Sequence, residues 1–180
     1  PFQYQYGNRF HPHTLRLSAG VYKYEDLLSD FLDDGSLSGF LIGSACAALY
    51  KRRIINNNSI RFVEGLKNNE DGLFNFEFAL YSKSLSVISD IVYNYRQSEA
   101  STIAARKTEN YGDKIFQYLD SRQWDNNRYC FDVQKKRRIV TLVWWDILHL
   151  YNDQPLLKSV KYIKYSLERK DVRVGLKLMR

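Results

Sequence analysis

Between Leu49 and Thr102 the chain reads Leu49-Tyr50-Lys51-Arg52, Asn58-Ser59-Ile60-Arg61-Phe62, Glu64-Gly65, Glu70-Asp71-Gly72-Leu73-Phe74-Asn75-Phe76, Tyr93-Asn94-Tyr95-Arg96 and Ala100-Ser101-Thr102. The order and spacing of these motifs, more than any one of them, decide which fold the sequence predicts. Apolar residues in 70–81 recur with the period of a helix, and Asn69 stands where its side chain could cap that helix. We therefore expect a helix that begins with two carboxylates.

The remaining patterns predict short elements on both sides of this helix. On the amino-terminal side we expect an extended segment at 1–19, helices at 24–32 and 40–53, and a short strand at 60–63. On the carboxyl-terminal side we expect strands at 87–88 and 91–95, then helices at 108–124, 134–151 and 156–169. Asn152-Asp153-Gln154-Pro155 separates the last two helices, because proline and short polar residues interrupt a helix. The pattern indicates an α+β fold that is mainly helical.

The composition suits one compact domain with a core. Of the 180 residues, 44% are hydrophobic and 15% aromatic. No apolar run approaches the roughly 20 residues of a membrane span, and the first residues lack a secretory pattern. Cys46 and Cys130 lie among apolar neighbours without metal-ligand spacing, so we expect buried free thiols and a cytoplasmic location.

From Tyr22 to about Thr102, the motifs together resemble the carboxyl-terminal half of the family 2 inverting glycosyltransferases. The resemblance implies the acceptor-side half of a GT-A fold (nucleotide-diphospho-sugar transferase) at residues 1–107, followed by a helical basic extension at 108–180. It also implies the activity of a hexosyltransferase of polysaccharide biosynthesis. Such an enzyme moves a sugar from a nucleotide-sugar donor to a glycan or lipid-linked acceptor, with inversion at the anomeric carbon.

The resemblance assigns roles to five residues. An acceptor hydroxyl must lose its proton as it attacks the anomeric carbon, and a carboxylate that accepts this proton is typically worth about 10²–10⁴-fold in rate. The family's Glu-Asp motif implies that Asp71 is this general base and that Glu70 orients the acceptor. Its Tyr-x-Tyr-Arg segment and downstream serine imply that Arg96, Tyr95 and Ser101 bind phosphate or sugar oxygens.

The same motifs also have structural interpretations. Acidic residues in the first turn of a helix stabilise it through the helix dipole, and Arg96 could be an exposed strand-end arginine paired with an acid. The chain also departs from the family, because relatives usually carry Trp-Asn-Lys-Leu-Tyr-Lys-Arg where it has Cys46-Ala47-Ala48-Leu49-Tyr50-Lys51-Arg52. The aromatic and amide residues absent here would belong to packing or to the acceptor pocket, so the departure concerns the acceptor more than the reaction.

The family's Asp-x-Asp metal motif does not occur in this sequence. The resemblance implies that a divalent cation, Mn²⁺ or Mg²⁺, binds ahead of this region in the complete enzyme. We expect this chain by itself to bind no metal, to bind nucleoside diphosphates only weakly and to transfer no sugar. His11, His13 and His149 have no acidic partners at zinc-ligand spacing. Because the chain opens at Pro1 and has one methionine, we expect a truncated piece that self-associates through an exposed apolar face.

Basic residues exceed acidic ones, with 27 Lys and Arg against 20 Asp and Glu. The excess lies in residues 135–138 and 158–180. Within residues 156–169 the lysines and the apolar residues lie on different faces, which is typical of a helix docked on an anionic membrane or of the outer face of a bundle. The rival functions are a nucleic-acid-binding module and a structural fragment that only dimerises. We expect no nucleic-acid partner, because no recognition motif is present and most tyrosines fall on predicted core faces.

Overall fold

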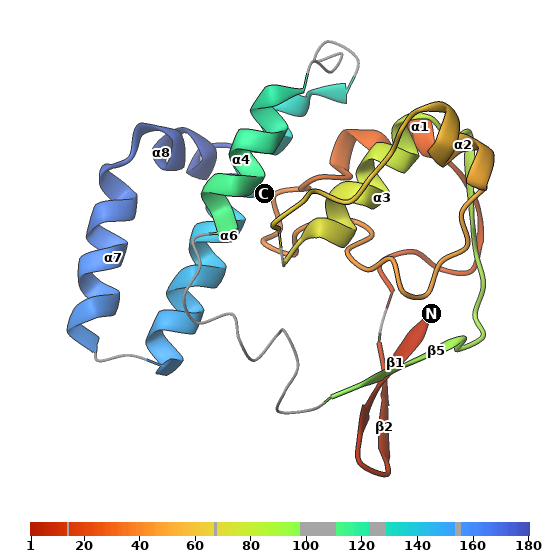
Figure 1. Cartoon of the computed structure of the whole chain (residues 1–180). Coiled ribbons are helices and arrows are strands. Elements are labelled where there is room, and N and C mark those ends of the chain that lie inside the picture. Colours follow the sequence, from red (N-terminus) through yellow and green to blue (C-terminus); the bar gives the residue numbers. More distant parts are fainter. Residues whose placement is uncertain (14, 67, 98–110, 123–128, 154–155) are drawn as a thin grey trace. The chain divides into compact units, whose positions relative to one another are not determined.

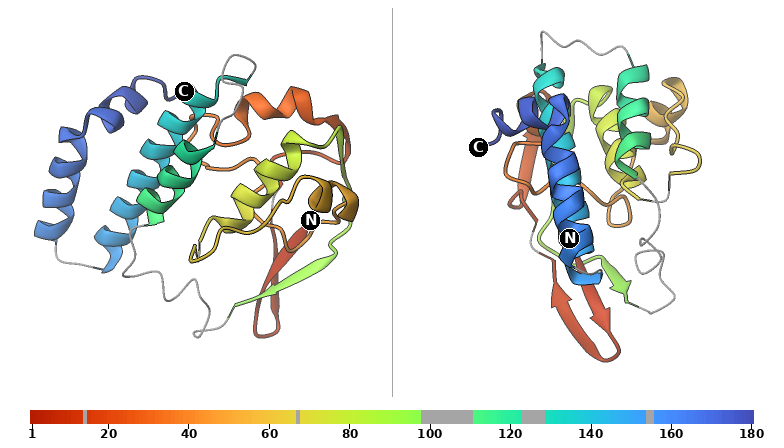
Figure 2. Two further views of the ribbon diagram at one scale, coloured as in Figure 1. Left: turned by 45° about the horizontal axis from the view of Figure 1, so that its top comes forward. Right: turned by 90° about the vertical axis from the view of Figure 1, so that its left-hand side faces the viewer.

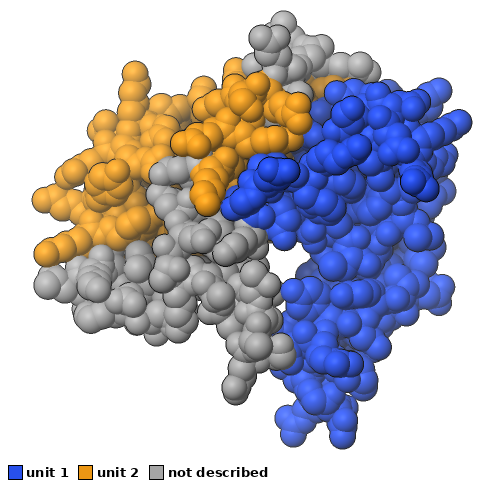
Figure 3. All heavy atoms as spheres, viewed as in Figure 1, with its two compact units in different colours: residues 1–28, 42–109 blue, residues 29–41, 110–180 orange. Residues whose placement is uncertain are grey.

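The structure, a computed structural model, describes residues 1–13, 15–66, 68–97, 111–122, 129–153 and 156–180. These residues form seven α-helices, one 3₁₀ helix and five strands, an α+β arrangement that is mainly helical (Figure 1). The chain divides into two compact units, coloured separately in Figure 3. Unit 1 comprises residues 1–28 and 42–109, and unit 2 comprises residues 29–41 and 110–180.

A three-stranded sheet opens unit 1. The strands β1 (Phe2–Tyr6) and β2 (Arg9–Pro12) form an antiparallel hairpin, and β5 (Tyr93–Arg96) pairs with β1 in parallel. The turn between β1 and β2 contains Gly7 with a φ of +59°, a conformation that glycine adopts without strain. The alternation of aromatic and polar residues therefore predicted this extended segment correctly, because alternate residues point to opposite faces of a sheet.

A second, two-stranded sheet is formed by β3 (Gly20–Lys23) and β4 (Ser84–Val87), which are antiparallel. The short helix α1 (Tyr24–Leu27) follows β3 directly, and the 3₁₀ helix η1 (Leu28–Asp30) continues it. The amide of Tyr24 donates to the carbonyl oxygen of Lys83, 3.1 Å away. The helix predicted at 24–32 is therefore present, but it ends earlier than its apolar pattern indicated.

The central helix of unit 1 is α3 (Glu70–Leu80), and its side chains are buried over most of its length. Phe74 and Phe78 pack on Ile60 in a cluster that partly buried residues extend: Tyr50, Ile54 and Ile55. The prediction of this helix is confirmed, but the predicted Asn69 cap is wrong. Asn69 has a left-handed backbone with a φ of 64°, and its side chain makes no capping hydrogen bond. A capping side chain normally extends from a β-region backbone, which Asn69 does not have.

The helix predicted at 40–53 and the strand predicted at 60–63 are both wrong. Only α2 (Arg52–Asn57) is helical, and the residues before it form an irregular segment. Ile60 is buried, but its amide donates to the carbonyl of Ile55 in the turn that follows α2, and it pairs with no strand. A buried apolar residue supplies the same sequence signal in a strand and in a turn that closes over a helix.

Unit 2 is a helical assembly around α6. Its helices are α4 (Tyr111–Ser121), α6 (Phe131–Asp153), α7 (Leu156–Glu168) and α8 (Lys170–Leu176). The other three helices all contact α6 (Figure 2). Ile139, Val143 and Val172 form the buried core between α6 and α8, which confirms the predicted period of α6. Among the helices in the described residues, none combines the length and apolarity that a membrane span needs.

Residues 29–41 are attached to α6 by polar contacts. Gln134 is fully buried, and its Oε1 accepts a hydrogen bond from the amide of Leu32 at 2.9 Å. The buried guanidinium of Arg138 lies 3.9 Å from Asp33 and over the ring of Phe40. Burial lowers the pKa of Arg138 to about 10, against the opposing effect of Asp33, so the guanidinium is charged at pH 7. This charge therefore lies inside unit 2 and not on its surface.

Two further residues of the basic run 135–138, Lys135 and Arg137, are also paired, whereas Lys136 is exposed. Arg137 lies 3.5 Å from Asp30 and donates to the carbonyl oxygen of Leu178, while Lys135 lies 3.2 Å from Asp120. A run that reads as a basic patch in the sequence thus makes contacts within unit 2.

Two expectations about burial are wrong. Cys46 and Cys130 are free thiols, but both are exposed. Cys46 lies in the irregular segment before α2, and Cys130 has a left-handed backbone just before α6. Of the tyrosines whose burial is described, only Tyr24 is buried, whereas most were placed on predicted core faces. Aromatic and polar residues alternate in the strands of these small sheets as they would in a strand that faces a core, so the pattern did not distinguish the two cases.

At Gly175 the backbone of α8 lies close against α6. A Cβ atom there would overlap the carbonyl oxygen of Lys136 and lie 2.7 Å from Cγ2 of Val140. We predict that Gly175→Ala lowers the free energy of unfolding by about 1–3 kcal/mol, because the backbone of α6 would have to shift. Chemical denaturation monitored by circular dichroism measures this. Gly43→Ala is the control, since nothing lies within 4 Å of its Cβ position, and an equal loss in both variants would contradict the prediction.

Candidate functional site

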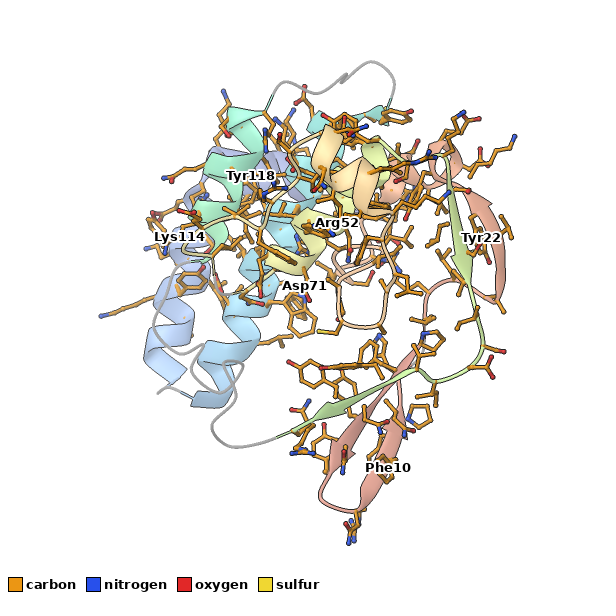
Figure 4. The ribbon with its side chains drawn as sticks, turned by 45° about the vertical axis from the view of Figure 1, so that its right-hand side comes forward. Phe10, Tyr22, Arg52, Asp71, Lys114 and Tyr118 are labelled. Carbon is orange, nitrogen blue, oxygen red and sulfur yellow. The ribbon has the colours of Figure 1, made fainter. Side chains whose placement is uncertain are left out.

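The first turn of α3 carries the two predicted catalytic carboxylates, Glu70 and Asp71. Figure 4 labels Asp71. Asp71 is half-buried, and its Oδ2 accepts a hydrogen bond from the amide of Ala45 at 3.0 Å. Its Oδ1 accepts no hydrogen bond from any residue that the structure describes. The amino-terminal end of the helix dipole stabilises negative charge in this turn, where Glu70 also lies half-buried. The carboxylate of Asp71 is thus oriented through one oxygen and has the other available.

One helical turn further on, the buried side chain of Asn75 holds the segment of residues 42–50 against α3. Its Nδ2 donates to the carbonyl oxygens of Ile42 at 3.0 Å and Ser44 at 3.2 Å. Its Oδ1 accepts a hydrogen bond from the hydroxyl of Tyr50 at 2.5 Å. These bonds take up carbonyl groups that a helix over residues 40–53 would need, which explains why that prediction failed.

Asn75 is the site residue that the sequence reasoning missed. Its signal was an amide four residues after Asp71, within an otherwise apolar stretch of helix. Residues spaced by four lie on the same face of a helix. A polar side chain at a core position needs hydrogen-bond partners. The position of Asn75 therefore contained a signal for a polar neighbour, but the sequence did not identify that neighbour.

Three tyrosines lie within electrostatic reach of Asp71 or its neighbours. Burial raises the pKa of Tyr50, and the charge of Asp71 adds to this effect. The side chain of Cys46, followed by partial burial, Tyr95 and Asp71, raises the pKa of Tyr93. The rings of Tyr93 and Tyr95 have centroids 6.3 Å apart. The predicted binding residue Tyr95 thus contacts a tyrosine, Tyr93, whose pKa the charge of Asp71 helps to raise.

The other predicted binding residues are placed differently. Arg96 is exposed at the end of β5, on the face opposite to Tyr95, because adjacent residues of a strand point to opposite faces. It makes no ion pair with an acid in the part of the chain that the structure describes. Ser101 lies outside the described residues.

The described residues contain no group of three or more His, Cys, Asp or Glu side chains that could hold a metal ion. They therefore do not fit the divalent cation that the family resemblance implies. His13 stacks on Phe2 with ring centroids 4.3 Å apart, and burial lowers its pKa below the ordinary value. His11 packs edge-on against Tyr6. Both act as aromatic packing groups, and the side chain of His149 lies outside the described part.

No protein-family model, curated protein or solved structure matches this chain. The assignment of a function therefore depends on the chemistry of the site itself.

Substitution of Asn75 tests whether its side chain fixes the segment 42–50 against α3. We predict that Asn75→Ala lowers the free energy of unfolding by about 1–3 kcal/mol or more, because buried carbonyls and a hydroxyl lose their partner. It should also accelerate hydrogen exchange at the amide of Ala45, since the segment 42–50 is then fixed mainly through Asp71. Tyr50→Phe is the matched control, because it removes only one of these hydrogen bonds. Unchanged exchange in Asn75→Ala would show that the amide does not hold the segment.

Proposed function

We propose that this chain is the acceptor-side part of a GT-A inverting glycosyltransferase in which Asp71 is the general base. The observation that carries the proposal is the carboxylate of Asp71, which accepts the Ala45 amide on Oδ2 and leaves Oδ1 without a hydrogen bond from the described residues. A base needs both a fixed direction and an available oxygen. A carboxylate that only stabilised the start of the helix would not require a hydrogen bond from the Ala45 amide in the segment before α2.

The proposed reaction is a single displacement. The acceptor hydroxyl gives its proton to Oδ1 of Asp71 while its oxygen forms the new bond to the anomeric carbon. The bond from that carbon to the diphosphate oxygen breaks at the same time, and the nucleoside diphosphate leaves with the electron pair. Attack from the face opposite to the leaving group inverts the anomeric configuration.

The neighbouring residues take supporting roles in this proposal. Glu70 orients the acceptor or its neighbours from the same helical turn, and Tyr95 binds a sugar hydroxyl. Arg96 and Ser101 bind phosphate or sugar oxygens. The nucleotide-sugar donor and the divalent cation bind to groups outside the described residues, because these supply no metal site.

The exposed face of α7 favours docking of this enzyme on an anionic membrane surface. Tyr162 and Ser166 face inward, where the Tyr162 hydroxyl donates to Asp146. Val160 and Leu167 are 52% and 49% exposed, and the exposed Lys161 and Lys164 lie on the same outer side. The expected separation of lysines and apolar residues onto different faces is therefore wrong for these four residues. The helix thus combines exposed apolar groups with cations, as an interfacial helix does. A lipid-linked acceptor would lie at that surface.

A nucleic-acid-binding function is disfavoured by the pairing of the basic run 135–138. Arg138 is buried against Asp33, and Arg137 and Lys135 each lie beside an aspartate. Phosphate binding draws on cations that face solvent. Three of the four cations in the run 135–138 instead lie beside acidic side chains of the same unit.

The first prediction of this proposal concerns Asp71. In the full-length protein, Asp71→Asn should lower the turnover number of sugar transfer by about 10²-fold or more and leave donor affinity nearly unchanged, since the base acts on the acceptor proton. An asparagine oxygen can still accept the Ala45 amide, so the segment 42–50 should keep its place. Steady-state kinetics with a nucleotide-sugar donor measures the effect. Asp90→Asn removes an exposed charge in the same unit and is the control; equal turnover in both variants would exclude Asp71 as the base.

The second prediction concerns α7. Lys161→Glu with Lys164→Glu should reduce binding to phosphatidylserine vesicles at low salt by roughly 10-fold or more, at about 1 kcal/mol for each cation near the surface. Vesicle co-sedimentation measures this. Lys83→Glu with Lys23→Glu is the control, because it makes the same change in net charge with exposed lysines of unit 1. A wild-type chain that does not bind these vesicles at low salt would disprove the docking.

A further inference from the structure

The register of the three-stranded sheet places aromatic residues from three segments on one face. Tyr4 of β1 lies directly opposite His11 of β2 and Tyr95 of β5. Phe2 lies opposite Tyr93 in the same way, and residues two apart on a strand share a face. We name this face, with Tyr4, Tyr6, His11, Tyr93 and Tyr95, the aromatic strip.

The rings of the aromatic strip are in continuous contact. Successive centroids are 6.3 Å apart from Tyr93 to Tyr95, 5.9 Å from Tyr95 to Tyr4, 6.4 Å from Tyr4 to Tyr6 and 5.7 Å from Tyr6 to His11. Most neighbouring pairs meet edge to face or tilted, so ring faces are not all covered by other rings. The strip is a row of aromatic surfaces and not a closed stack.

Solvent exposure distinguishes the strip from a core. Tyr6 is 51% exposed and Tyr93 38% exposed, while Tyr4 and Tyr95 are half-buried. Only Phe2, at one end, is buried, and His13 stacks on it. Cross-strand aromatic pairs stabilise a sheet by about 0.2–1 kcal/mol each. That role does not require tyrosines as exposed as Tyr6 and Tyr93.

One end of the strip, at Tyr93, lies within electrostatic reach of the proposed base. Cys46 raises the pKa of the Tyr93 hydroxyl, and it lies in the segment whose Ala45 amide donates a hydrogen bond to Asp71. The charge of Asp71 also reaches Tyr93, where it contributes to the raised pKa of that hydroxyl. A chain-like molecule on the strip could therefore place one end near Asp71 while its other units follow the rings toward the β1–β2 turn.

The charged residues of the sheet indicate which class of ligand could bind to the aromatic strip. None of the three strands carries an acidic residue, and their two arginines lie on opposite faces: Arg9 opposite Tyr6 at the outer end, and Arg96 on the other side. A single-stranded nucleic acid needs cations along its backbone as well as stacking rings. A neutral carbohydrate needs apolar ring surfaces for its C–H faces and hydroxyls for its own hydroxyls.

We propose that the aromatic strip binds the acceptor as a neutral oligosaccharide, with pyranose C–H faces packed on its rings and sugar hydroxyls bonded to its tyrosine hydroxyls. This inference rests on the proposed function and deepens it, since it assigns the sugars of the acceptor to a defined face of the three-stranded sheet. The lipid of a lipid-linked acceptor would then lie beyond the sugars that the strip holds.

The test is a titration of this chain with cellotetraose, maltotetraose and chitotetraose, followed by NMR of the aromatic ring signals. At least one of the three should shift the signals of Tyr4, Tyr6, Tyr93 or Tyr95. Tyr6→Ala should weaken its binding by about fivefold. Phe10→Ala is the matched control, because Phe10 is 48% exposed on the same hairpin but lies opposite Gln5 on the other face (Figure 4).

Four outcomes would overturn the inference: no shift with any of the three sugars, equal loss in Tyr6→Ala and Phe10→Ala, strip binding of a dT oligonucleotide in place of the sugars, or self-association through the strip that excludes them. Asp71→Asn separates the two proposals, because it should bind the sugar like the wild type. If Asp71→Asn keeps full turnover in the full-length protein while Tyr6→Ala loses sugar binding, the aromatic strip stands as a carbohydrate site and the proposed base does not.

Discussion

The candidate site depends on the hydrogen bonds of the Asn75 side chain. It lies on a buried face of α3 and binds two carbonyl oxygens of the segment 42–50 and the hydroxyl of Tyr50. A buried amide without hydrogen-bond partners would destabilise the fold by about 1–3 kcal/mol. The segment 42–50 is therefore stabilised in the position where its groups form hydrogen bonds with the Asn75 side chain. This position brings the amide of Ala45 to Asp71, and Cys46 to Tyr93.

The proposed chemistry depends on that placement. A helix start favours negative charge, but charge alone does not make a general base, which also needs a direction and a nearby acceptor. The Ala45 amide supplies the direction for Asp71, and the tyrosines beginning at Tyr93 supply a surface on which an acceptor could lie. In unit 2, by contrast, charged side chains serve packing, because Arg138 and Asp33 attach residues 29–41 to α6.

The sequence predicted those parts of the fold whose signal is local. The period of apolar residues in α3, α6 and α7 and the alternation in β1 depend only on neighbours within a few positions, so these elements were found. The irregular segment before α2 was not, because the residue that determines it, Asn75, lies 31 and 33 positions from the carbonyls it binds. The pairing of Arg138 with Asp33 was equally invisible to a local pattern. For the site, the sequence placed Glu70 and Asp71 at the helix start, whereas the contact with Ala45 depended on the fold.

The anomeric configuration of the product tests the central claim most directly. A single displacement assisted by Asp71 must invert the configuration of the transferred sugar, whatever the donor. The full-length protein would be incubated with UDP-glucose, UDP-galactose, UDP-N-acetylglucosamine and GDP-mannose and an oligosaccharide acceptor, and the new linkage would be assigned by proton NMR. The account predicts a β-linked product from an α-linked donor. An α-linked product from such a donor, or no transfer from any of the four, would contradict it.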